Sequence, residues 1–421
     1  MANTYISRTH SGTATDTKKI TYSAWLKFGT DDSTEAILVE WLDGNYRVEF
    51  LRLDTGEIRF EWIDSGNNSA YFKTVRKFRD VNAWYHFVFT LDTTLATAGD
   101  RIKLYINGVR ETEFDSSYGT MNPTLNKACR MNENGKTVYM GQRGNSAQYW
   151  TGSMSHIHFV DGTAYQADTF GSTDSTTGEW KINTSPTVTY GNHGWFILKD
   201  GNSVTDQSGN GNNCTASGTL TKTEDNPSNV FCTLNPLATG NSAPTFSKGN
   251  NRVTANATNY QFSCGTIAVP LTGKWYWEVK ANDNVNGSST EYLIGAVLES
   301  RLEASGNFAE FAADGIAQYG SVSPNIGQND IIGVSVDRTA ATLKIYKNNS
   351  LILTKSSLPA ELIYPMVTVF GSVSADANFG NGYFGGTAVS SAGTNASNNG
   401  IFEYDVIPSD ANALSTKGLN L

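Results

Sequence analysis

The sequence of 421 residues predicts an all-β protein built from two antiparallel β-sandwiches in tandem. Residues 101–107 alternate strictly between apolar and polar side chains, which is the periodicity of a β-strand. Similar short runs recur along the chain with turn signals about every 8–12 residues, and helical periodicity is almost absent. The 9 tryptophans need more buried surface than one face of a single sheet provides. We therefore expect the apolar faces of two sheets to meet in each half.

The first half contains the strongest hairpin signal of the chain. Apolar residues occupy every second position of the 101–107 run, and Asn107-Gly108 follows directly. A type I′ turn needs positive φ at both central residues, which asparagine and glycine tolerate. This predicts a hairpin with a return strand over residues 109–114. The other strands expected in this half are residues 20–28, 48–53, 58–63 and 85–91, with a turn at 54–57.

The second half repeats this style without repeating the sequence. Trp275, Trp277 and Val279 lie two residues apart and would share one face of a strand. The strands expected here are residues 275–279, 332–336, 343–346 and 351–353, with a turn at 347–350.

Two segments have the composition of loops rather than strands. Residues 200–237 hold Gly, Asn, Asp and Pro at a density typical of turns, so we place the domain junction there. Residues 385–400 are small and polar, which suits a flexible arm or a segment that lies ordered along a partner. The predicted organisation is a sandwich over 1–182, a junction with strands and loops over 183–250, a second sandwich over 251–386 and a polar C-terminal arm over 387–421.

Charge and hydropathy exclude several classes of protein. The chain has 31 Lys and Arg against 40 Asp and Glu, and the resulting net charge of −9 disfavours binding to nucleic acid. No run of about 20 apolar residues is present, so we expect no membrane insertion. Residues 1–20 are polar and lack the apolar core of a secretory signal, which predicts synthesis and folding in the cytoplasm.

The four cysteines show no metal-binding or redox spacing. Cys129, Cys214, Cys232 and Cys264 contain no C-x-x-C pair, which predicts free, mostly buried thiols. A disulfide between Cys214 and Cys232 stays open as an alternative.

Several strings in the first half resemble a known family. YISRTHSG (5–12), YSAWLKF (22–28) and the stretch 79–112, with its AWYH and YINGVRE strings, are similar to concanavalin A-like, laminin-G-type jelly rolls of bacteriophage virion proteins. The string FVDGTAYQADTFGSTDSTTGEWKI (159–182) is similar to the same family, and NPSNVFCTLNPL (226–237) looks like the junction in such phage proteins.

The second half resembles a SPRY-like sandwich. The matching strings are GKWYWEV (273–279), IIGVSVD (331–337) and LKIYKNN (343–349). Together, the resemblances imply a non-enzymatic virion structural protein: a tail fibre, a head fibre or a capsid decoration. They imply other virion proteins as partners, a homo-oligomer with a trimer favoured, and a host-surface glycan as a ligand, with synthesis in the host cytoplasm. The alternative is a glycan-binding lectin or a glycan-degrading enzyme.

The carboxylates do not form the pattern of a glycanase. Such enzymes of this fold carry two carboxylates on one strand face, flanking the scissile bond. The nearest candidates are Glu57 with Glu61 and Glu111 with Glu113. The second pair follows a hairpin tip, where a solvated strand face is the simpler interpretation, so we predict no catalytic residues.

Metal ligands are equally sparse. His156 and His158 could touch one metal from a shared strand face, with Asp161 as the only near third ligand. An ordinary strand with outward histidines is the favoured interpretation. The segment 206–212 lacks the ligand order of a calcium loop. We predict neither a metal nor a cofactor.

Three loops are candidates for glycan binding. Residues 141–150 combine amides, a cation and aromatic rings, which suits stacking on a sugar with polar groups nearby. The alternative for Trp150 is that it caps the sandwich core. A weaker candidate is the loop of Trp41, Asp43 and Asn45, and a third, 282–290, lacks an aromatic anchor. The candidate residues are Arg143, Asn145, Gln148, Tyr149, Trp150, Asp43 and Asn45.

Overall fold

Antiparallel strands make up both halves of the chain, which confirms the all-β prediction. The computed structural model describes residues 4–29, 33–80, 83–117, 122–199, 201, 203–239, 242–284, 292–302, 318–319, 326–390, 393–394, 399–404 and 410–419. The chain divides into two units, Met1–Lys222 and Thr223–Leu421. The division falls inside the predicted junction, 183–250. The junction strands before the division belong to sheets of the first unit, and those after it belong to sheets of the second.

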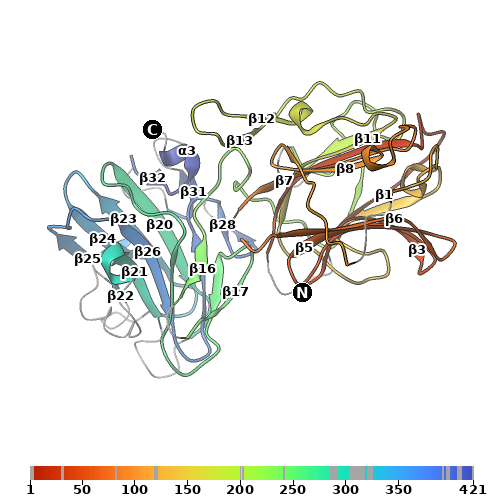
Figure 1. The fold of residues 1–421 in the computed structure, drawn as a ribbon. Coiled ribbons are helices and arrows are strands. Elements are labelled where there is room, and N and C mark those ends of the chain that lie inside the picture. The colour runs from red at the N-terminus through yellow and green to blue at the C-terminus, as the bar shows by residue number, and fades with distance from the viewer. Residues whose placement is uncertain are drawn as a thin grey trace. The chain divides into compact units, whose positions relative to one another are not determined.

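The first unit contains two facing sheets (Figure 1). In spatial order, the strands of the seven-stranded sheet are β15 (Thr215–Ser217), β1 (Tyr5–Thr9), β10 (Thr137–Met140), β3 (Glu35–Asp43), β4 (Tyr46–Arg52), β5 (Glu57–Asp64) and β6 (Asn67–Lys77). Those of the six-stranded sheet are β14 (Trp195–Ile197), β11 (Ser153–Asp161), β2 (Lys19–Lys27), β7 (Tyr85–Asp92), β8 (Ile102–Ile106) and β9 (Val109–Arg110). Short 3-10 helices lie at Ala98–Asp100, Arg130–Asn132 and Ala167–Thr169.

The core of the first unit lies between these two sheets and is rich in aromatic rings. Alternate residues of β7, including Phe87 and Phe89, face inward as the sequence predicts. Phe50 of β4 and Phe60 of β5 approach Phe89 from the opposite sheet, with ring centroids 5.9 and 4.6 Å away. Trp62 is fully buried in the same core. Burial of these rings is the main favourable contribution to the stability of the unit.

The hairpin at Asn107-Gly108 is confirmed, but its return strand is shorter than expected. Asn107 and Gly108 have φ values of 47° and 81°, as a type I′ turn requires. The β9 strand ends at Arg110 because the chain then crosses to the other sheet, where Phe114 bridges Thr74. The expectation of a strand over 109–114 was therefore wrong beyond its first two residues.

The outward histidines of β11 are buried, not solvated. A β-bulge interrupts the pairing of β11 with β2, and His156 sits in it with φ at 47°. The short strands β12 (Gly171–Thr173) and β13 (Trp180–Ile182) pair with each other and form a flap on the outer side of the six-stranded sheet (Figure 1). His158 is 2 % exposed and stacks on Phe196, with ring centroids 3.9 Å apart. Within the described residues, no three His, Cys, Asp or Glu side chains lie close enough together to hold a metal ion.

The second unit is also built around two sheets. In spatial order, the five-stranded sheet contains β16 (Leu234–Thr239), β19 (Gln261–Gly265), β26 (Ile363–Val369), β21 (Tyr292–Leu298) and β22 (Gln318–Tyr319). The eight-stranded sheet contains β17 (Thr245–Ser247), β18 (Arg252–Thr254), β27 (Ser374–Asn378), β20 (Lys274–Ala281), β23 (Ile331–Asp337), β24 (Thr342–Lys347) and β25 (Ser350–Ser356), with β32 (Asn412–Ala413) pairing parallel to β20. Small elements complete it: α1 (Glu299–Leu302), β28 (Tyr383–Phe384), β29 (Thr387–Ala388), β30 (Gly393–Thr394), β31 (Ile401–Phe402) and α3 (Thr416–Leu419).

The described part of the C-terminal segment packs into the second unit. Leu414 belongs to the core between the two sheets. Phe402 and Ala413 cover Tyr276 on the outer face of β20. These contacts give residues 399–404 and 410–419 a fixed place, rather than that of a free arm.

The cysteines are free and buried, so the structure contains no Cys214–Cys232 disulfide. No helix in the described part of the chain has the length and apolar character needed to cross a membrane.

Candidate functional site

Two of the loops singled out in the sequence lie together in the first unit. Because β10 pairs with β3, the segment after β10 runs alongside β3. Gly141 donates its N–H to the carbonyl of Ala36, and Ala36 donates its own N–H to the carbonyl of Gln148. Gly144 has a φ of 90°, and a Cβ there would lie 2.8 Å from Cβ of Trp41, so glycine permits this close approach.

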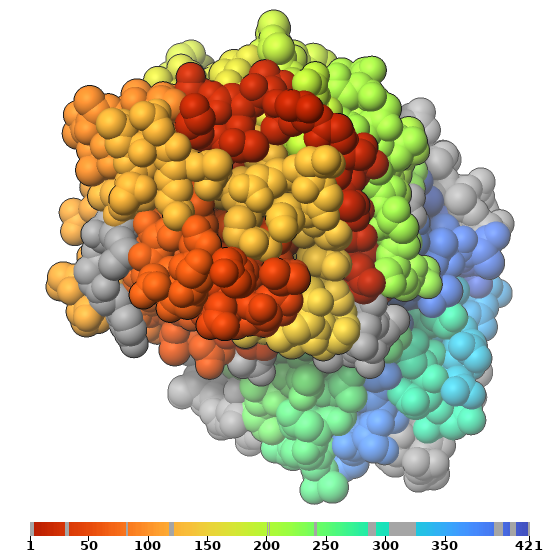
Figure 2. All heavy atoms as spheres, turned by 90° about the vertical axis from the view of Figure 1, so that its right-hand side faces the viewer, coloured from red at the N-terminus to blue at the C-terminus, as the bar shows by residue number. Residues whose placement is uncertain are grey.

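The outer face of β3, β4 and β5 supplies the other side chains of this surface. Side chains alternate along each strand, and Val48, Phe50 and Phe60 point into the core. The residues between them therefore point outward. Cross-strand pairing places Glu49 opposite Glu61 and Trp41 opposite Arg47. In Figure 2 the orange-red surface near residue 50 adjoins the gold surface near residue 140.

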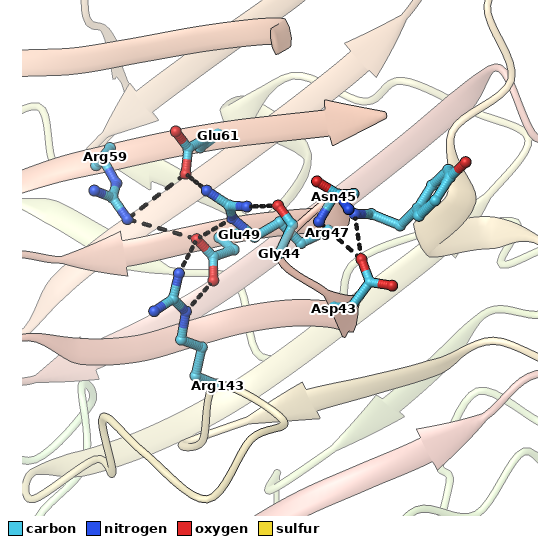
Figure 3. Close-up of polar contacts among 9 residues, drawn as sticks. Asp43, Gly44, Asn45, Arg47, Glu49, Arg59, Glu61 and Arg143 are labelled. Atoms are coloured by element: carbon cyan, nitrogen blue, oxygen red, sulfur yellow. Dashed lines mark hydrogen bonds and ion pairs between the residues drawn. The ribbon is translucent and has the colours of Figure 1, made fainter. Parts of the chain in front are cut away.

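A fully buried carboxylate organises three arginines on this face (Figure 3). Glu49 accepts hydrogen bonds from Nε of Arg47 at 3.2 Å, and from Nε and Nη2 of Arg143, the second at 3.2 Å. Nη2 of Arg59 lies 3.5 Å from Glu49 and 3.9 Å from Glu61. Glu61 also accepts a hydrogen bond from Nη2 of Arg47 at 2.9 Å. We call Arg47, Arg59 and Arg143 the arginine cluster.

Trp41 forms the aromatic part of the surface. The guanidinium carbons of Arg143 and Arg47 lie 4.4 and 5.6 Å from the centroid of its ring. These distances are those of cation–π contacts, which hold the ring and the guanidinium groups in fixed positions. Trp41 itself remains half-buried, so part of its surface is accessible.

The turn between β3 and β4 is held by its own side chains. Asp43 accepts the backbone N–H groups of Asn45 at 2.8 Å and of Tyr46 at 3.1 Å. Arg47 donates from Nη1 to the carbonyl of Gly44 (Figure 3). Asp43 and Asn45 are both exposed at the edge of the arginine cluster.

The aromatic residues at the end of the 141–150 loop differ in their surroundings. Trp150 packs against the sandwich core, with its ring centroid 5.3 Å from that of Phe28. This is the core-capping position considered for it from the sequence. Tyr149 and Gln148 are half-buried, and Asn145 is exposed. Of this loop, Arg143 makes the contacts that join it to β4.

Sequence reasoning missed Arg47, Glu49 and Arg59. The turn at 54–57 contained the necessary signal, because hairpin pairing across it places Glu49 opposite Glu61. Glu57 does not join Glu61; its carboxylate contacts Lys77 at 3.2 Å, beyond a β-bulge.

The other candidate groups bond to nearby parts of the chain. One oxygen of Glu111 accepts the N–H groups of Thr112 and Glu113, and the other lies 3.4 Å from Nε of Arg76. The Asp206 carboxylate accepts N–H groups from Phe196, Ser208 and Asn212, which shapes the 206–212 loop. Most of the third candidate loop, 282–290, lies outside the described residues.

The first unit is similar in sequence to a known family. Residues 2–170 match the family model described as the concanavalin A-like lectin/glucanases superfamily. No curated protein shows a significant match to the sequence.

Several solved structures are similar at low identity. The SPRY domain of human HERC1 shares 16% identity over 34% of this chain and 96% of its own, with a TM-score of 0.29. A SAP-like pentraxin from Limulus polyphemus shares 17% identity over 39% of this chain and 72% of its own, at a TM-score of 0.28. A Bacteroides ovatus protein inferred to bind carbohydrate shares 15% identity over 53% of this chain and 59% of its own, at a TM-score of 0.34. Over residues 2–170 in sequence, and in the paired antiparallel sheets of its first unit, this chain is similar to the concanavalin A-like lectins and glucanases.

Proposed function

We propose that this protein is a non-enzymatic, glycan-binding structural component of a bacteriophage particle. The observation that carries the binding function is the meeting of two loops over one sheet face. Arg143 from the 141–150 loop bonds to Glu49 and lies over Trp41, beside the exposed Asp43 and Asn45. The phage assignment is supported by the sequence resemblance of the first half and of the junction to bacteriophage virion proteins.

The chemistry of this surface suits hydroxyl-rich ligands. Guanidinium and amide groups donate several hydrogen bonds, and the carboxylate of Asp43 accepts them. The arginine cluster and Trp41 are held in place by ion pairs and cation–π contacts, so binding would immobilise few side chains. A half-buried tryptophan adds an apolar surface for the C–H groups of a sugar.

The same geometry disfavours glycan hydrolysis. Glu49 and Glu61 face each other across β4 and β5, as a catalytic pair would. However, Glu49 has no exposed surface and contacts three guanidinium groups, so it cannot reach a glycosidic oxygen. A general acid must hold a proton within hydrogen-bond reach of the substrate.

Polysaccharide binding tests the proposed function directly. We expect the purified chain to bind at least one polymer of a panel of bacterial surface polysaccharides without releasing reducing ends. Trp41→Ala should weaken that binding, whereas Val109→Ala, an exposed substitution on the opposite sheet, should not. Absence of binding to every polymer, or equal binding by the Trp41 variant, would contradict the proposed surface. Release of reducing ends would contradict the non-enzymatic assignment.

A second experiment tests the structural role. We expect the chain to be a stable homo-oligomer, a trimer by preference, when its mass is measured by light scattering. Labelled protein or antibody should mark a fixed position on phage particles in electron micrographs. A monomer that is absent from particles would contradict the virion assignment.

A further inference from the structure

We propose that the ligand of this surface is an acidic polysaccharide whose carboxylate binds Arg59. The inference rests on the proposed glycan-binding function and specifies the class of glycan. It starts from a difference among the members of the arginine cluster. Arg47 and Arg143 donate hydrogen bonds to carboxylates or carbonyls, whereas Arg59 approaches its carboxylates only at 3.5 and 3.9 Å.

Arg59 has unused hydrogen-bond donors at a partly buried position. Its side chain is 24% exposed, and Nη2 makes only the two long contacts to Glu49 and Glu61. The buried Nε, which a ligand cannot reach, also has no hydrogen-bond partner among the described residues, so the accessible donors are those at the end of the guanidinium. A guanidinium presents donors in a planar fork that matches a carboxylate. A carboxylate supplied by a ligand would provide the acceptors that this part of the chain does not.

The charges around Arg59 do not cancel, so the surface can accept an anion. The cluster and its two carboxylates, Glu49 and Glu61, carry three positive and two negative charges, a sum of +1. Lys73, the cross-strand neighbour of Arg59, is paired with Asp115 at 2.8 Å. Asp43 lies at the far side, where its carboxylate is held by the N–H groups of the turn. An anion would therefore neutralise the surplus charge next to Arg59.

Matched neutral and acidic polymers test this inference. We would measure binding of the full chain to polygalacturonate and to its methyl ester, and to dextran sulfate and dextran. We expect polygalacturonate to bind at least about tenfold more tightly than its ester, as the loss of a charge-assisted contact implies. Arg59→Gln should remove this preference, and Arg59→Lys should restore only part of it. Arg110→Gln, the same charge change on the opposite sheet, should leave it intact.

The possible failures of this experiment are distinguishable. Equal binding of polygalacturonate and its ester would overturn the acidic-ligand inference while leaving glycan binding in place. Dextran sulfate binding as tightly as polygalacturonate, and weakening equally with salt, would indicate a general polyanion surface and overturn the carboxylate assignment. An Arg59→Gln variant that keeps the full preference would overturn the role of Arg59. If the unmodified chain bound neither these polymers nor any polymer of the bacterial panel, the proposed function itself would be overturned.

Discussion

The two units share a β-sandwich architecture, but burial lowers the pKa of histidines in the first unit and raises the pKa of a glutamate in the second. All five histidines of the sequence lie in the first unit. Burial lowers the pKa of His10 and of His86 to about 3, and it lowers that of His158 well below its usual value. The second unit has no histidine and instead buries Glu278, whose pKa burial raises to about 7. The stability of two similar folds can therefore change in opposite directions in mild acid.

His86 and Glu278 have different kinds of hydrogen-bond partner. The His86 ring bonds to the Ser23 hydroxyl at 2.9 Å, accepts a hydrogen bond from Nε1 of Trp180 at 2.9 Å, and stacks on Trp25. Glu278 accepts the backbone N–H groups of Glu403 and Tyr404, at 2.8 and 2.9 Å. Its hydrogen bonds thus fix residues 403–404 of the C-terminal segment on β20.

The largest expected effect is acid destabilisation of the first unit. The three histidines are neutral in the folded unit, whereas the unfolded chain takes up their protons below about pH 6.5. Stability is therefore complete above that pH and falls as the pH drops toward 3, by about 2 kcal/mol at pH 5 for each of His10 and His86. We expect His10 and His86 together to account for a loss of about 4 kcal/mol between pH 7.5 and 5, and His158 to add to that loss. Urea unfolding followed by hydrogen-exchange mass spectrometry would read each unit separately.

The second unit should respond in the opposite sense. The raised pKa means that folded Glu278 binds a proton more tightly than the unfolded chain does. Its stabilising effect is present below the unfolded pKa and is lost as the pH rises through 7. We expect the second unit to lose about 2–3 kcal/mol between pH 5 and 8. Glu278→Gln should abolish this dependence, and a variant with an unchanged pH profile would contradict the assignment to Glu278.

Replacing a single histidine would sharpen the comparison. His86→Phe keeps a ring beside Trp25 but loses the hydrogen bonds to Ser23 and Trp180. We expect a loss of about 1–3 kcal/mol at pH 7.5, the usual range for two buried hydrogen bonds. The variant should also lose less stability in acid, by about 2 kcal/mol between pH 7.5 and 5, because His86 no longer contributes. The same pH series gives the number of protons that the first unit takes up on unfolding. If His86 were already protonated in the folded unit, the substitution would leave this number unchanged, which would contradict the assignment.

The smallest expected effect concerns the binding surface. Gly144→Ala places a Cβ against Trp41 at a residue with φ of 90°, and we expect a stability loss of about 1–2 kcal/mol. Because the added Cβ displaces the 141–150 loop, we expect the free energy of polysaccharide binding to decrease by more than the free energy of unfolding. Gly135→Ala, at a φ of 76° with no atom within 4 Å, is the matched control for backbone strain alone. Equal binding by the two variants would show that the loop position is unimportant.

The sequence predicted features that depend on neighbouring residues. The alternation in β8 and the turn at Asn107-Gly108 are local, and both appear as expected. The end of β9 depends on Phe114 reaching the other sheet, which no local pattern encodes. The burial of His158 likewise depends on contacts with Tyr190 and Phe196, more than 30 residues away.

The candidate site shows the same division. Composition singled out the 141–150 loop and the turn at Asp43, but not the sheet face between them. Glu49 and Arg59 read as ordinary outward residues of alternating strands. Their significance comes from Arg143, which is 94 residues from Glu49 in sequence and reaches it only after β10 pairs with β3.

The most direct test of the proposed function is to map where a bound polysaccharide protects the chain. Hydrogen exchange would be measured with and without polygalacturonate, or with whichever polymer of the panel binds most tightly. We predict protection of peptides covering residues 41–61 and 141–150 in the first unit, and none in the second. Protection confined to other peptides, or to the second unit, would contradict the assignment of the binding surface.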